Sequence, residues 1–126
     1  MLTLPSAVRI YMASEPVDLR RGFDGLSAAT RHIIRADPLS GHLFVFVNRR
    51  SNRLKVLLWQ PSGFLLLYKR LERGTFKRPR APSLGHRHIE MDSTELALMI
   101  EGIDLRDARR RARWIPPNTL ASGVAI

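Results

Sequence analysis

The fold is decided by residues 42–71, which read HLFVFVNRRSNRLKVLLWQPSGFLLLYKRL. Three runs rich in large apolar residues, at 42–47, 54–59 and 64–71, are typical of β-strands. The polar segment 48–53 and the turn-forming Gln60-Pro-Ser-Gly63 separate them. Because connections this short join antiparallel neighbours, we predict a three-stranded meander. Its first strand is apolar on both faces, so we expect both sides of the sheet to be largely covered.

The segment before the meander is predicted to hold one strand and one helix. Residues 7–12 alternate between apolar and polar side chains, which predicts a short strand. Apolar residues then recur at helical spacing, and we expect a helix that is N-capped by Asp18 and extends to about Ala36. Asp37-Pro38 would end it.

The segment after the meander begins with a loop rich in Gly, Pro and Arg at 72–88, followed by a short predicted strand at 88–91. Asp92 and Glu95 then have capping-box spacing, which predicts a helix that ends at Gly102. The predicted fold class is α+β: an antiparallel β-meander with flanking helices, forming a single small domain over residues 1–115. We expect residues 116–126 to be a flexible C-terminal tail.

Composition excludes several classes of protein. The chain has 126 residues, 44% of them hydrophobic, which is too apolar for a disordered tail. It contains no cysteine, which rules out disulfide frameworks and thiol nucleophiles. It has no apolar run long enough to span a membrane and no secretory signal, so we expect a cytoplasmic protein without membrane contact.

The formal net charge of +10 is concentrated in the middle of the chain. Residues 49–88 hold eleven cations and one acid, Glu72, and 18 of the 21 cations in the whole chain are arginine. Arginine pairs bidentately with phosphate, so a small domain this basic is expected to bind a polyanion such as a nucleic acid. Charge alone leaves RNA open as an alternative.

Two arginine groups that are far apart in sequence are predicted to meet. In a meander, the end of the last strand returns to the beginning of the strand before it, which would bring 69–73 to the same end of the sheet as 49–53. The alternative is a solvated loop paired with acids elsewhere. The candidate nucleic-acid-binding residues are Arg49, Arg50, Arg53, Lys55, Lys69, Arg70, Arg73, Lys77, Arg78 and Arg80.

Four aromatic residues lie in or next to this basic region. Trp59, Phe64 and Tyr68 belong to apolar strand runs, so we expect them in the core rather than stacked on bases. Phe76 lies in the basic loop and is the better candidate for stacking on a base.

The sequence does not favour catalysis or a metal centre. Its carboxylates show no spacing typical of a phosphoryl-transfer site, so we predict no catalytic residues and no enzyme activity. His86 and His88 would face the same side of a strand, but no third ligand is evident, and we predict neither a metal nor a cofactor. The basic run 106–113, with Arg109 and its neighbours, is open to a second DNA contact, a docking arm or a solvated helix face.

Five motifs, in the same order, resemble a known family. They are Asp18-Leu-Arg-Arg-Gly-Phe-Asp-Gly-Leu26, Asp37-Pro-Leu-Ser-Gly-His-Leu-Phe-Val-Phe46, Asn52-Arg-Leu-Lys-Val-Leu-Leu-Trp59, Tyr68-Lys-Arg-Leu-Glu-Arg-Gly-Thr-Phe76 and Glu101-Gly-Ile-Asp104. Together they resemble the TnpB accessory protein of bacterial insertion sequences of the sixty-six type, which is distinct from the RNA-guided nuclease of the same name. The resemblance covers about residues 5–115.

The resemblance implies a role in DNA transposition of a mobile genetic element, with the transposase of the same element as a partner. It supplies no catalytic residues. The leading hypothesis is therefore a non-catalytic, basic accessory protein that binds DNA during transposition and DNA recombination. The alternative is a protein–protein adaptor that docks on the transposase without direct DNA contact. A nuclease acting in its own right is a third hypothesis. The sequence leaves the oligomeric state open.

Overall fold

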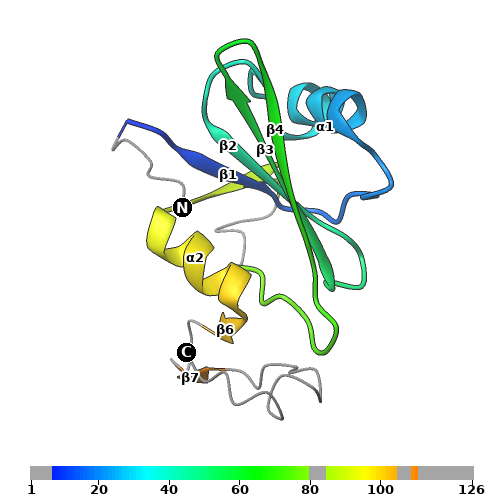
Figure 1. Ribbon diagram of the computed structural model, residues 1–126, viewed down its shortest axis with the longest axis vertical. Coiled ribbons are helices and arrows are strands. Elements are labelled where there is room, and N and C mark those ends of the chain that lie inside the picture. The colour runs from blue at the N-terminus through cyan, green and yellow to red at the C-terminus, as the bar shows by residue number, and fades with distance from the viewer. Residues whose placement is uncertain (1–6, 80–84, 105–108, 111–126) are drawn as a thin grey trace, which may run out of the picture.

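The computed structural model in Figure 1 describes residues 7–79, 85–104 and 109–110. Five strands form one sheet in the order β4-β3-β2-β1-β5. Their bounds are β1 (Ile10–Ala13), β2 (Leu43–Val47), β3 (Arg53–Gln60), β4 (Gly63–Arg70) and β5 (His88–Met91). With helices on the two sequence flanks, this is the predicted α+β fold. The predicted boundary between residues 115 and 116 lies outside the described residues.

The β2–β3–β4 meander is confirmed, and every neighbouring pair in it is antiparallel. The sheet as a whole is mixed, because β1 runs parallel to β2. A parallel pair needs a long crossover connection, and the helical segment between these two strands provides it. β5 then pairs antiparallel with β1 and forms one edge of the sheet, while β4 forms the other.

The first helix begins later than the sequence predicts. Asp18 is not its N-cap, because Gly22 occupies that position without a side-chain hydrogen bond. The Asp18 carboxylate instead accepts a hydrogen bond of 3.0 Å from the backbone N–H of Arg20, which is a local turn of the kind that aspartate favours. Val17 and Leu19 are buried on either side of Asp18 and hold this segment in the core, outside the helix.

The helical segment consists of α1 (Phe23–Ala29) and a π-helical turn, η1 (Thr30–Ile34). The buried hydroxyl of Thr30 donates a 2.8 Å hydrogen bond to the Leu26 carbonyl. Arg35 then adopts a left-handed conformation, so the helix ends just before the predicted Ala36. Side-chain bonding to the preceding turn is a known cause of local helix distortion.

The second helix, α2 (Ser93–Glu101), is confirmed together with its predicted caps. The Asp92 carboxylate accepts a 2.7 Å hydrogen bond from the backbone N–H of Glu95, and the Glu95 carboxylate accepts one of 3.0 Å from the backbone N–H of Asp92. Gly102 ends the helix at φ +83°, a backbone conformation that glycine adopts without strain.

A small two-stranded sheet follows α2 and pairs β6 (Ile103–Asp104) antiparallel with β7 (Arg109–Arg110). Of the three readings left open for the run 106–113, the solvated helix face is therefore wrong at Arg109 and Arg110, whose backbones are extended and paired with β6. Arg111 and Arg113 lie outside the described residues.

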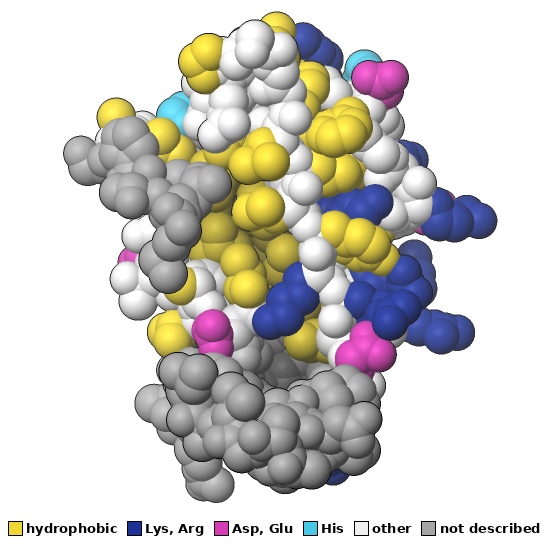
Figure 2. Space-filling view, in the orientation of Figure 1, with side chains coloured by type: hydrophobic (Ala, Val, Ile, Leu, Met, Phe, Trp, Pro, Cys, Tyr) yellow, Lys and Arg dark blue, Asp and Glu magenta, His cyan; other side chains and the backbone are white. Residues whose placement is uncertain are grey.

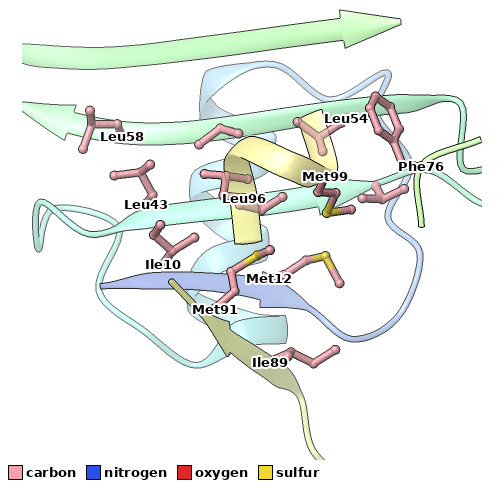
Figure 3. Packing of buried hydrophobic residues seen from close by; sticks show 13 residues of the cluster. Ile10, Met12, Leu43, Leu54, Leu58, Phe76, Ile89, Met91, Leu96 and Met99 are labelled. Atoms are coloured by element: carbon pink, nitrogen blue, oxygen red, sulfur yellow. The ribbon is translucent and has the colours of Figure 1, made fainter. Parts of the chain in front are cut away.

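The sheet has a hydrophobic cluster on each face, with α1 and α2 on opposite sides (Figures 1 and 3). Every residue of β2 is buried: Val45 and its alternate neighbours pack toward α2, whereas Phe44 and Phe46 pack toward α1. From α2, Leu96 and Met99 enter the first cluster. The expectation that both faces of the meander are covered is thus confirmed for β2, its first strand and the central strand of the whole sheet.

Candidate nucleic-acid interface

One end of the sheet gathers cations from β3, β4 and the hairpin between β2 and β3. Arg53 lies directly opposite Arg70 in the β3–β4 register, as the meander predicts. Figure 2 shows Lys and Arg side chains concentrated on the right-hand side of the molecule. Lys69 does not belong to this cluster of cations, because its side chain lies on the opposite face of the sheet. There its Nζ donates a 2.8 Å hydrogen bond to the Ile100 carbonyl of α2.

The β2–β3 hairpin is held by the side chain of Asn48. Its Oδ1 accepts hydrogen bonds of 3.0 Å from the backbone N–H groups of Asn52 and Arg53, and its Nδ2 donates one of 2.8 Å to the side chain of Asn52. These hydrogen bonds stabilise the conformation of the turn, and Arg49 and Arg50 are exposed at the tip of the hairpin.

An open hollow of about 710 Å³ lies beside this tip, and we call it the basic hollow. Residues 16–20, residues 48–50, Arg53, Lys55 and Tyr68 line it. A 3.0 Å backbone hydrogen bond from Val17 to Val47 attaches the 16–20 segment to the end of β2. The hollow is therefore built where three separate parts of the chain meet.

Lys55 forms part of the floor of the basic hollow. It is only 9% exposed, and its Nζ donates a 2.9 Å hydrogen bond to the Arg21 carbonyl. The same Nζ lies 4.8 Å from the centre of the Tyr68 ring, where a cation–π interaction is favourable. Lys55 thus joins β3 to the segment before α1, and its charge is much less accessible than those of Arg49 and Arg50.

The aromatic assignments change at two positions. Phe76, the better of the four candidates for stacking on a base, is 2% exposed, and its backbone N–H donates a 2.7 Å hydrogen bond to the carbonyl of Ser51. Tyr68, expected in the core, is 50% exposed in the basic hollow because β4 is an edge strand. Trp59 and Phe64 are partly buried and pack edge to face, with ring centres 5.0 Å apart.

The basic hollow includes a cation that the sequence analysis did not select. The Arg20 guanidinium donates to the Asp18 carboxylate, with a shortest distance of 2.7 Å. This side-chain hydrogen bonding lowers the pKa of Asp18 from 3.8 to about 2. The motif Asp18-Leu-Arg-Arg is the sequence signal that could have identified Arg20, but its residues are typical of a helix start and are interpreted as one above.

The remaining predicted residues do not converge on the basic hollow. Arg70 forms a 2.7 Å ion pair with Glu72, so its charge is compensated. Arg73 and Lys77 are exposed and do not line the hollow, whereas Arg78 is partly buried. Arg80 lies outside the described residues. Of the nine predicted residues that the structure describes, four line the hollow: Arg49, Arg50, Arg53 and Lys55.

The described part of the chain contains no group of three or more His, Cys, Asp or Glu side chains placed to hold a metal ion. The ring of His88, one of the two predicted histidines, lies edge-on to Tyr11, and its Nδ1 is 3.1 Å from the Ile34 carbonyl oxygen. None of the described helices has the length and apolar character needed to cross a membrane.

The structure thus defines a small, mixed α+β domain with a cationic hollow at one end of its sheet. The model of the family described as IS66 Orf2 like protein matches residues 8–110, and the chain belongs to this family. Membership implies an accessory role in IS66 transposition, in agreement with the resemblance carried by the five motifs.

Two proteins of Sinorhizobium fredii (strain NBRC 101917 / NGR234) are similar to the chain. Uncharacterized protein y4jC is 38% identical over 104 residues, which cover 82% of this chain and 86% of y4jC. Uncharacterized protein y4hO is 36% identical over 115 residues, which cover 90% of this chain and 96% of y4hO. No solved structure matches the chain.

Proposed function

We propose that this protein is a non-catalytic accessory factor of IS66 transposition that contacts DNA phosphates through Arg49, Arg50 and Arg53. The observation that carries the proposal is the convergence of these three arginines on the basic hollow. None of them forms an ion pair with a carboxylate of the described residues. Uncompensated guanidinium groups with a planar donor fork suit bidentate binding of phosphate.

The rigidity of the hairpin supports this role. The hydrogen bonds of Asn48 hold the turn that carries Arg49 and Arg50, and Arg53 is held by its hydrogen bond to the Tyr68 hydroxyl. Less conformational entropy is lost when such groups bind a ligand than when they lie on a mobile loop. The only carboxylate among the described residues lining the hollow is Asp18, which Arg20 already engages.

The salt dependence of DNA binding tests the proposal. The slope of log K for binding to a duplex fragment, plotted against log salt concentration, measures the number of phosphate contacts. We expect this slope to become less negative by about 2.7 when Arg49, Arg50 and Arg53 are all changed to alanine, since each contact contributes about 0.9. The control changes Arg9, Arg31 and Arg87 to alanine, which removes the same formal charge outside the hollow. Arg9 and Arg31 already pair with Glu90 and Asp37.

An unchanged slope in the hollow variant, or an equal loss in the control, would refute the role of the three arginines. In that case, co-purification with the transposase that survives nuclease treatment would favour the adaptor hypothesis. Metal-dependent nicking of DNA by the pure protein, abolished by a single carboxylate substitution, would contradict the non-catalytic assignment.

A further inference from the structure

The outer edge of β4 is a long strand edge with no partner among the described residues. β4 pairs only with β3, and this pairing runs without a bulge from Gly63 to Arg70. Edge strands are commonly protected by proline, by charged side chains or by bulges. The stretch 63–68 has neither a proline nor a charged residue, so this edge is open to strand addition.

The hydrogen-bond pattern identifies which backbone groups face outward. The N–H of Leu71 bonds to the carbonyl of Asn52 at 2.8 Å, and these residues are directly opposite when the β3–β4 register is extended by one residue. In an antiparallel pair, residues that bond to the neighbouring strand alternate with residues that do not. Odd-numbered residues of β4 therefore bond to β3, and the outward-facing groups belong to Phe64, Leu66, Tyr68 and Arg70.

The exposure of side chains on both faces of β4 favours a strand, rather than a helix, as a partner for this edge. Leu67 is 44% exposed and Tyr68 is 50% exposed. As adjacent strand residues they point to opposite faces of the sheet, so a helix docked on one face would cover only one of them. A further strand beside β4 would shield both.

The cations at the end of β4 narrow the chemistry of that strand. Arg70 already pairs with Glu72, and Lys69 already donates to a carbonyl of α2. Both cations therefore already have polar partners within the chain, and the uncharged stretch 63–68 leaves most of the edge suited to an apolar strand. β4 itself meets this description over 63–68.

We propose that two copies of the chain pair through antiparallel β4 strands, with a two-fold axis at Leu67. In this register Phe64 of each copy forms backbone hydrogen bonds with Arg70 of the other, and Leu66 does so with Tyr68, so all four outward-facing residues are paired. The two cationic strand ends lie at opposite ends of the paired strands. The axis is perpendicular to the sheet, so both basic hollows face the same side. The inference is independent of DNA binding.

Sedimentation velocity of the DNA-free protein, at increasing concentration and physiological ionic strength, tests the pairing. The wild type is expected to form a dimer. Leu67→Lys is expected to remain monomeric, because it opposes two ammonium groups across the axis. The matched control is Leu39→Lys, which changes a leucine of similar exposure (46%) outside β4 and should still form the dimer. A monomeric wild type, or equal behaviour of the two variants, overturns the proposal.

A cross-link tests the register without relying on loss of binding. Because the chain has no cysteine, Leu67→Cys introduces a single thiol. At a non-hydrogen-bonded pair the two Cα atoms lie about 4.5 Å apart, within reach of a disulfide. Mild oxidation should link most of the Leu67→Cys protein into dimers and little of the Leu39→Cys protein. Equal yields overturn the register and the interface.

Discussion

The guanidinium of Arg53 donates a hydrogen bond to the hydroxyl of Tyr68, fifteen residues further along the chain. Lys55, two residues after Arg53, lies over the ring of the same tyrosine. One exposed aromatic side chain therefore orients two cations on the same face of the β3–β4 hairpin. Tyr68 therefore lines the basic hollow and also positions two of the cations that line it.

This contact predicts energetic coupling between the two side chains. Tyr68→Phe removes the hydroxyl but keeps the ring beneath Lys55, while Arg53→Ala removes the donor. In a double-mutant cycle measured by urea unfolding, we expect a coupling free energy of about 1 kcal/mol. Strictly additive effects of the two substitutions would mean that the hydrogen bond does not contribute to stability.

Lys55 is predicted to act through the fold rather than through phosphate. Lys55→Met leaves the Arg21 carbonyl without its donor, and we expect the free energy of unfolding to fall by about 1–3 kcal/mol. The salt slope of DNA binding should change little. The control is Lys77→Met, which alters an exposed cation and should change stability by less than about 0.5 kcal/mol. A loss of salt slope with unchanged stability would contradict this assignment.

The Asp18–Arg20 pair predicts a pH dependence at low pH. Because the pKa of Asp18 is lowered from 3.8 to about 2, the stabilisation it provides is present above the unfolded-state value and is lost as the pH falls toward 2. A carboxyl-carbon NMR titration should give a value near 2 in the wild type. Arg20→Gln should raise this pKa toward 3.8, whereas Arg21→Gln should change it less, because Arg21 has the smallest influence.

The burial of Phe76 predicts that its substitution affects stability rather than DNA binding. Phe76→Ala should lower the free energy of unfolding by about 3–5 kcal/mol, because it removes a ring that is almost fully buried in the α2-side cluster. Phe76→Leu should cost less and should bind single-stranded and duplex DNA as tightly as the wild type. A specific loss of single-strand affinity in Phe76→Leu would restore the role in base stacking.

The meander could be predicted because its signals are local. Gln60-Pro-Ser-Gly63 and the polar segment 48–53 impose short connections, and short connections determine both strand direction and register. The opposition of Arg53 and Arg70 follows from them. Asp92 and Glu95 carried the start of α2 in the same way, since a capping box is complete within four residues.

The errors arose where local patterns compete with distant contacts. Asp18 has the chemistry of an N-cap, but buried neighbours and Arg20 hold it in a turn before the helix. Lys69 and Arg70 are adjacent in sequence, yet they face opposite sides of the sheet and bind different partners. Neither periodicity nor composition indicates which partner each side chain will meet.

The sequence by itself determined the fold class, the β2–β3–β4 meander, the family and the concentration of charge in the middle of the chain, because all of these depend on short-range patterns and ordered motifs. Only the tertiary structure decided the order of the strands. By placing β4 at an edge, that order exposes Tyr68, while the course of the following loop buries Phe76. The physical reason is that burial depends on what lies beside a strand, and the neighbours of β4 are set by contacts across the whole sheet.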